Sequence, residues 1–181
     1  MSAIAPGFLV AVPQLGDPNF HRAVVLMLEH SDRGAMGLVV NRPAPLKLSE
    51  VAKGHGIKVG AAYDSAVVFV GGPVEPERGF VLHGHTELPE AIPLFDGMFV
   101  SGSLDSLKML FAGPPEHFRL CLGYAGWAPG QIEKELQEGA WITAEPNSKH
   151  VLETPPAQMW ESVLKDMGID PVMLMHTGGL Q

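Results

Sequence analysis

The chain has 181 residues, of which 46% are hydrophobic and 18% charged, and this composition is typical of a globular protein with its own core. The formal net charge is −8 with only 12 Lys and Arg, which disfavours direct nucleic-acid binding, because neutralised phosphates supply most of that affinity. The single cysteine, Cys121, excludes a disulfide framework within the chain. We expect one domain over residues 1–181.

The sequence indicates neither a membrane span nor a signal peptide. No run reaches the roughly 18 apolar residues that a spanning helix needs. The N-terminal stretch MSAIAPGFLVAVPQLGD has no early Lys or Arg and no long apolar core before Pro13. With one cysteine in addition, these features favour a cytoplasmic protein.

Strands are expected to dominate the first half of the chain. The runs at 7–12, 22–30 and 34–42 are continuous, apolar and rich in β-branched residues, which is typical of strands buried on both faces. Residues 48–56, LSEVAKGHG, predict a short helix that ends at a glycine. Three further strands are expected at 65–72, 78–84 and 96–102.

The second half mixes helices and strands without a regular alternation. We expect helices at 103–112, 129–138 and 155–167, the last with an apolar stripe of Met159, Trp160, Val163, Leu164 and Met167. Strands are expected at 117–124 and 140–145. The pattern predicts the α+β class: a single domain with about four helices and a mixed, largely antiparallel, barrel-like sheet.

The stretch LEHSDRGAMGLVVNRP, residues 28–43, combines a Glu–His pair with Arg and Asn inside an apolar run. Its SDRG segment predicts a hairpin turn, so that Glu29 opposes Met36 and His30 opposes Ala35. Because side chains alternate along a strand, Glu29 is expected to point with Met27, and His30 with Leu26. The Glu–His pair is therefore not expected to enter one pocket unless a bulge intervenes.

The same hairpin register separates two polar groups. Glu29 and His30 lie near the turn, where capping of loop backbone groups is the simplest interpretation. Arg22, Asn41 and Arg42 lie together at the open end, about 20 Å away by strand rise. These arginines either form a structural ion pair with a carboxylate such as Asp17 or face a ligand.

Three long blocks resemble the signature blocks of the YqgE/AlgH family, in the family's order. They are DPNFHRAVVLMLEHSDRGAMGLVVNRP, VFVGGPVEPERGFVLH and LGYAGWAPGQIEKEL, and the resemblance covers about residues 6–170. It implies a bacterial, cytosolic protein with a compact α+β fold and a barrel-like sheet. Most members are uncharacterised, one branch is described as a transcriptional regulator, and no established active site comes with the resemblance.

Other patterns in the sequence give weaker evidence for a functional site. His83 and His85 have the spacing of a metal pair, but the sequence offers no strong third ligand, so no metal site is assigned. Arg119 lies beside Cys121 in the predicted strand and could lower its thiol pKa, although a free cysteine is commonly a buried hydrophobe. The segment 123–127 is expected to form a glycine-rich turn that enters the next helix.

We favour a non-catalytic protein that binds a small ligand or a protein partner in a regulatory role, without a cofactor. The candidate ligand-binding residues are Arg22, Asn41, Arg42, Tyr124 and Trp127. One alternative is an enzyme, a hydrolase or a thiol-dependent activity, with its site near Arg22, Asn41 and Arg42 or near His30 and Cys121. The other is a DNA-binding transcriptional regulator. The oligomeric state stays open.

Overall fold

The computed structural model describes residues 4–13, 17–84 and 87–177, and within them it contains ten strands and six α-helices. The strands are β1 (Gly7–Ala11), β2 (Val24–Ser31), β3 (Gly34–Val39), β4 (Pro43–Lys47), β5 (Val67–Val70), β6 (Val74–His83), β7 (Ile92–Phe95), β8 (Met98–Ser101), β9 (Phe118–Trp127) and β10 (Trp141–Ala144). The α-helices are α1 (Leu48–Gly54), α2 (Leu104–Phe111), α3 (Gln131–Gln137), α4 (Ser148–Leu152), α5 (Pro156–Asp166) and α6 (Pro171–Thr177). Short 3-10 helices span Pro18–Phe20, Ala61–Tyr63 and Pro115–His117.

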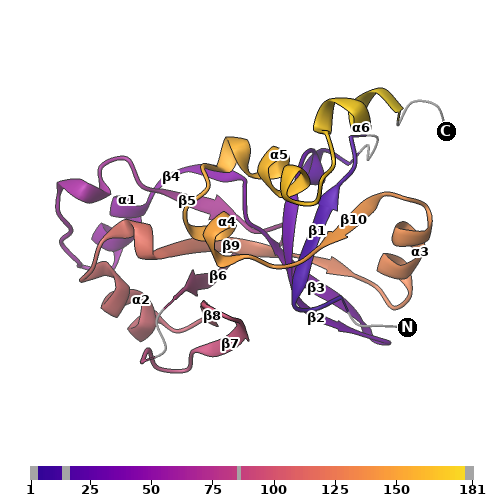
Figure 1. Ribbon diagram of the computed structural model, residues 1–181. Coiled ribbons are helices and arrows are strands. Elements are labelled where there is room, and N and C mark those ends of the chain that lie inside the picture. Colours follow the sequence, from indigo (N-terminus) through magenta and orange to yellow (C-terminus); the bar gives the residue numbers. More distant parts are fainter. Residues whose placement is uncertain (1–3, 14–16, 85–86, 178–181) are drawn as a thin grey trace.

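All ten strands belong to one sheet, whose two halves are joined by strand β9. Along one edge β9 pairs with β6, and along the other it pairs first with β5 and then with β3. The main strand order is β10-β1-β2-β3-β9-β6-β8-β7, with β4 attached through β5. In Figure 1, β1 and β2 run up the page whereas β6 and β9 run across it, so the sheet curls into a half-barrel. Among the described pairings only β5–β9 is parallel, which confirms the expected mixed, largely antiparallel sheet.

The inner face of the curled sheet is covered by helix α5. Its stripe of Met159, Trp160, Val163 and Leu164 is buried against apolar side chains from both halves of the sheet, and the indole Nε1 of Trp160 donates to the Ala11 carbonyl at 2.8 Å. Figure 1 shows α5 lying along the top of the sheet. This helix therefore closes the main core, as its predicted apolar stripe requires.

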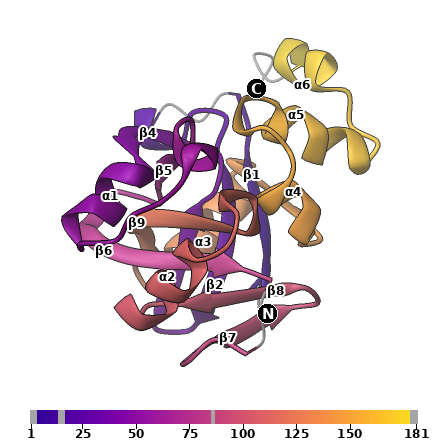
Figure 2. The same ribbon diagram turned by 90° about the vertical axis from the view of Figure 1, so that its left-hand side faces the viewer.

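The outer face carries two smaller apolar clusters, one on each half of the sheet. Helices α1 and α2 cover the half around β5, β6 and β9, where Leu107, Leu110 and Phe111 of α2 are buried. Helix α3 covers the other half through Ile132. Figure 2 shows α1 and α2 on the opposite side of the molecule from α5 and α6. In the part of the chain that the structure describes, no helix is both long and apolar enough to cross a membrane.

Gly123 allows strand β9 to change partners. It has a φ of +76°, and it lies between Leu122, which pairs with β5, and Ala125, which pairs with β3. A Cβ at this position would lie 2.4 Å from the Gly72 carbonyl oxygen. Both the backbone conformation and the close approach of Gly72 therefore require glycine. The expected turn at 123–127 is wrong, because these residues continue strand β9 to Trp127.

The β2–β3 hairpin confirms the predicted register near its turn but contains a bulge. Glu29 pairs with Met36, and His30 with Ala35, whereas Met27 pairs with Gly37, so that Leu28 is an extra residue. Met36 packs on the inner core and Ala35 on the α3 cluster. The expected side-chain directions are therefore wrong. Glu29 points to the inner face of the sheet, and His30 points to the outer face with Met27.

The described chain also contains elements that the sequence pattern did not predict. Strands β4 and β7 carry prolines and have short, partly exposed sequences, so their alternation is weak. Helix α4 has five residues, and α6 lies in the tail, for which only partial order was expected. These two helices raise the helix number from the expected four to six.

The contact between α5 and the sheet predicts a large stability effect for Trp160. We expect Trp160→Ala to lower the free energy of unfolding by about 3–5 kcal/mol, because it removes a buried ring. Trp160→Phe should cost about 1–3 kcal/mol, because the Ala11 carbonyl loses its donor. Urea denaturation measures both, with Met109→Ala as the control, since Met109 is 49% exposed on α2. Equal losses in Trp160→Ala and Met109→Ala would contradict the assignment.

Candidate functional site

The structure brings together the three polar residues predicted at the open end of the hairpin. Arg22, Asn41 and Arg42 line one cavity of about 180 Å³, whose opposite wall is the first turn and a half of helix α5. The other lining residues are His21, Pro156, Ala157, Trp160 and Glu161. The hairpin thus contributes the polar side of this cavity, and α5 contributes the other side. We call it the arginine cavity.

Two of the predicted residues mainly build the wall of the arginine cavity. The Asn41 side chain accepts the Val24 N–H at 3.0 Å and donates to the Arg22 carbonyl at 2.9 Å. The Arg42 guanidinium donates to the carbonyls of Pro18, Asn19 and His21. These contacts hold the short 3-10 turn against the sheet. Asp17, the carboxylate considered as an ion-pair partner, instead caps that turn by accepting the Asn19 N–H.

Arg22 is the residue of the arginine cavity that is best placed to meet a ligand. Its backbone has a φ of +52°, a conformation that costs a non-glycine residue roughly 1 kcal/mol. Its guanidinium carbon lies 5.1 Å from the centre of the Trp160 ring, and Nη1 lies 4.0 Å from Glu161 Oε1. The side chain is 45% exposed, so it combines a fixed stacking partner with access to solvent.

The predicted aromatic residues lie at other places on the sheet. Trp127 is buried on the outer face, where its Nε1 donates to Glu135 at 3.1 Å; the Trp141 indole donates to the same carboxylate oxygen. Tyr124 packs edge-on against Phe80, and a hydrogen bond to the Glu75 carboxylate raises the pKa of Tyr124. Tyr124 and Trp127 both line a separate open cavity of about 490 Å³ beside the hairpin turn. The structure therefore divides the five predicted residues between two cavities.

His30 holds two distant segments together. Its Nδ1 accepts the Ile4 N–H at 3.1 Å, so the proton is on Nε2, which donates to Glu133 of α3 at 3.1 Å. The Glu133 pKa is lowered by a backbone hydrogen bond at the start of α3 and by the hydrogen bond with His30. Both ring nitrogens are occupied by structural contacts, which agrees with capping of backbone groups.

Cys121 is remote from His30. The thiol belongs to the inner core, whereas His30 lies on the outer face. Burial raises the pKa of Cys121 to about 12, and the attraction of Arg119 offsets only part of this shift. The side chain is fully buried, so burial outweighs the nearby cation and the thiol stays protonated.

His83 is fully buried at the end of strand β6. Its Nε2 lies 2.7 Å from the Ser101 hydroxyl oxygen, and its ring stacks on Phe99. The second histidine of the predicted pair, His85, lies outside the described residues. Within the described ranges, no three His, Cys, Asp or Glu side chains come together in a group that could hold a metal ion.

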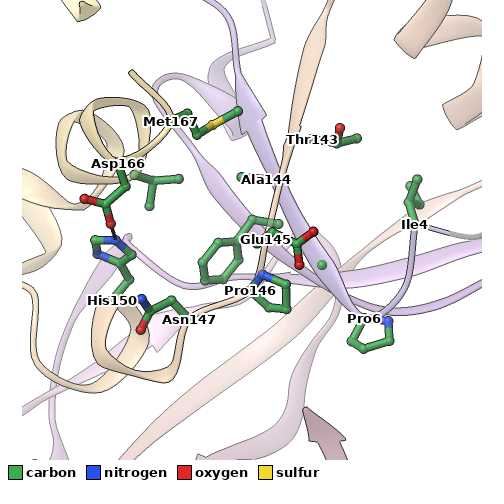
Figure 3. A pocket seen from close by; sticks show the side chains of 13 residues that line it. Ile4, Pro6, Thr143, Ala144, Glu145, Pro146, Asn147, His150, Asp166 and Met167 are labelled. Carbon is green, nitrogen blue, oxygen red and sulfur yellow. Dashed lines mark hydrogen bonds and ion pairs between the residues drawn. The ribbon is translucent and has the colours of Figure 1, made fainter. Parts of the chain in front are cut away.

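A further cavity was not predicted from the sequence. It has a volume of about 640 Å³ and lies between β1, β10 and the C-terminal half of α5. Figure 3 shows His150 and Asp166 on one side, Ile4 and Pro6 on the other, and Glu145 between them. His150 Nε2 lies 2.5 Å from Asp166 Oδ2. We call this space the acidic cavity.

The contacts of His150 resemble those of a catalytic triad but do not place a nucleophile at the acidic cavity. His150 Nδ1 contacts the Thr154 hydroxyl at 3.1 Å, while Nε2 contacts Asp166. Thr154 is not among the residues that line the cavity, so its hydroxyl lies across the imidazole ring from the available space. The His–Thr spacing of four residues is a helix-face pattern, but nothing in the sequence links that pair to Asp166.

We expect the two arginines of the arginine cavity to differ in their effect on stability. Arg42→Ala should lower the free energy of unfolding by about 1–3 kcal/mol, because backbone carbonyls lose a charged donor. Arg22→Ala should change it by less than about 1 kcal/mol, because its ion pair is exposed. Chemical denaturation of both variants tests this difference. Equal destabilisation would make Arg22 a structural residue as well.

The buried Cys121 thiol gives a second prediction. The native protein should not react with a thiol reagent such as 5,5′-dithiobis(2-nitrobenzoate) near pH 8, because the thiol is inaccessible and neutral. The urea-unfolded protein should react within the mixing time, and absorbance measures both rates. Rapid labelling of the native protein would show that Cys121 is a reactive thiol.

Comparison with known proteins reveals relatives over almost the whole chain. The AlgH-like family model matches residues 8–172. A UPF0301 protein of Myxococcus xanthus is 49% identical over 180 residues, which are 99% of each chain. A UPF0301 protein of Alcanivorax borkumensis is 40% identical over 174 residues, covering 94% of this chain and 93% of its own. These names state no reaction, ligand or partner.

Two solved structures have the same fold. The solution structure of the AlgH protein from Pseudomonas aeruginosa matches with a TM-score of 0.77 and 35% identity, over 96% of this chain and 94% of that one. A crystal structure of a Corynebacterium diphtheriae protein matches with a TM-score of 0.78 over 96% and 92% of the two chains. Its identity of 19% supports similarity of fold alone. These matches confirm the resemblance that the three sequence blocks indicate.

Proposed function

This chain belongs to the AlgH-like family, and we propose that it binds a small anion, without catalysis, in a regulatory role in the cytoplasm. The arginine cavity, where Arg22 faces the start of α5, is the observation that carries this proposal. Its volume of about 180 Å³ is small compared with sites for drug-sized ligands and suits a phosphate or a short carboxylate.

The electrostatics of the arginine cavity favour an anion. A guanidinium group can bind a carboxylate or phosphate through two parallel hydrogen bonds. Helix α5 points its N-terminal end, with Pro156 and Ala157, into the same space. Pro155 and Pro156 have no N–H, and the Gln158 N–H already donates to the Pro155 carbonyl, so Ala157 is the first residue of the helix that can offer a backbone donor. The helix dipole makes this end positive. Glu161 opposes these effects, and its distance of 4.0 Å from Arg22 makes it a built-in competitor for the ligand.

The composition of the arginine cavity supports binding over hydrolysis or thiol chemistry. Its lining residues include one histidine, His21, but no Ser, Thr or Cys that could act as a nucleophile. Cys121 is enclosed in the inner core. These features support a non-catalytic role for the cavity.

A regulatory role agrees with the position of Trp160. Its indole ring is buried in the main core and hydrogen-bonded to Ala11, yet it also lines the arginine cavity beneath Arg22. An anion that draws Arg22 toward itself would change the contact of the guanidinium with this ring. Occupancy of the cavity would thus be coupled to the packing of α5, an element that a partner could sense.

The proposal is tested by titrating the protein with sodium phosphate and with succinate, at constant ionic strength. We expect shifts of the Trp160 indole resonance in ¹H–¹⁵N spectra and saturable binding by calorimetry. Arg22→Ala should weaken binding at least about tenfold, because a charged hydrogen-bond donor is lost. Glu161→Gln should strengthen binding a few-fold, because a competing carboxylate is removed.

Arg33→Ala provides the control, because Arg33 is an exposed arginine near the hairpin turn that does not line the arginine cavity. It should bind both anions as the parent protein does. Equal weakening by Arg22→Ala and Arg33→Ala would mean nonspecific attraction of the anion. Failure of both probes to bind would overturn the proposed anion site.

A further inference from the structure

The acidic cavity takes no part in the proposed anion binding, and it differs from the arginine cavity in size and charge. Its volume of about 640 Å³ lies within the usual range for small-molecule sites. Along helix α5 it lies beyond the arginine cavity, because its α5 residues are Val163 and Asp166, three and six positions after Trp160. A ligand of the acidic cavity would therefore bind independently of an anion in the arginine cavity.

The charged groups of the acidic cavity all have one sign. Glu145 and Asp166 contribute carboxylates, and the cavity lining contains neither Lys nor Arg. Asp166 is also the last residue of α5, where the helix dipole adds negative potential. Figure 3 shows the Glu145 carboxylate pointing into the space between the two walls. A ligand with a positive charge would meet complementary potential from two directions.

The His150–Asp166 contact holds one of these carboxylates in place through its Oδ2 atom. An ionised carboxylate only accepts hydrogen bonds, so His150 Nε2 carries the proton and donates to Asp166 Oδ2. The Thr154 hydroxyl lies 3.1 Å from Nδ1, so both ring nitrogens of His150 have a partner. The histidine is buried, whereas the Asp166 side chain is 62% exposed.

The remaining walls of the acidic cavity are apolar. Phe8 and Val163 lie beneath it in the main core with only 1% and 2% of their surface exposed, and the more exposed Met167 closes one side. Ile4 and Pro6 lie on the side opposite His150 (Figure 3). Such walls bind hydrocarbon or aromatic groups, whereas a fully hydrated inorganic cation would gain nothing from them.

We propose that the acidic cavity binds an organic amine, with the ammonium group attracted by the carboxylates of Glu145 and Asp166 and the apolar body placed against Ile4, Pro6 or Met167. The Asn147 side chain, beside His150 in Figure 3, provides a further polar group at the rim. Such a ligand combines a positive charge with an apolar body, and so matches both the acidic and the apolar walls.

Three probes with one apolar body test this assignment. They are 2-phenylethylamine, its neutral analogue 2-phenylethanol and the anionic analogue 3-phenylpropanoate, each titrated calorimetrically into the full-length protein. Work near pH 8 keeps the amine protonated. We expect the amine to bind at least about tenfold more tightly than the alcohol, because its charged hydrogen bonds are the stronger ones.

Substitutions then locate the bound amine. Glu145→Gln and Asp166→Asn should each weaken amine binding about tenfold and leave alcohol binding unchanged, because only a charge is removed. An asparagine at position 166 retains an oxygen acceptor for His150. Glu153→Gln is the matched control, because Glu153 is an exposed carboxylate after α4 that does not line the cavity. Thermal denaturation of each variant confirms that it is folded.

Each outcome decides the proposal. Selective amine binding that both cavity variants weaken, and Glu153→Gln does not, would support it. Equal binding of the amine and the alcohol would show a merely apolar cavity and overturn it. Equal weakening by all three variants would show general attraction to an acidic protein, and preference for the carboxylate or no binding of any probe would also overturn it. None of these results depends on whether phosphate or succinate binds the arginine cavity.

Discussion

The burial of helix α5 in the curled sheet is the interaction on which both cavities depend. Four apolar side chains of this helix are buried, each worth roughly 1.5–3 kcal/mol when removed from water. The Trp160 indole adds a hydrogen bond to Ala11, a residue 149 positions earlier in the chain. Because this contact fixes where α5 begins and ends on the sheet, it also determines which side chains meet at each end.

The direction of α5 gives the two cavities opposite polarity. The N-terminal end of the helix meets Arg22 and Arg42, and its C-terminal end carries Asp166 beside His150. The helix dipole reinforces both arrangements, because it is positive at the first end and negative at the second. One packed element therefore organises an electropositive and an electronegative space, each lined on the other side by residues of the sheet.

The β2–β3 hairpin shows which structural features the local sequence predicts and which it does not. Turn chemistry and alternation predicted the pairing of Glu29 with Met36 and the grouping of Arg22, Asn41 and Arg42 at the open end. The bulge at Leu28 was not predictable, because an apolar run gives no sign of an extra residue. That single residue reverses the faces beyond it, and it brings His30 to Glu133 of α3. The side chains of Asn41 and Arg42 form hydrogen bonds with backbone groups, and this role also became apparent only in the folded chain.

The sequence by itself determined the α+β class, the family, the main strands, the apolar stripe of α5 and the polar cluster at the hairpin's open end. These features rest on periodicity, turn residues and long matching blocks, which are local along the chain. Only the tertiary structure decided that strand β9 serves both halves of the sheet, that Tyr124 and Trp127 lie away from the arginines, and that His150 meets Asp166. Such contacts join residues far apart in sequence, and their partners are selected by the packing of whole elements, which no local pattern encodes.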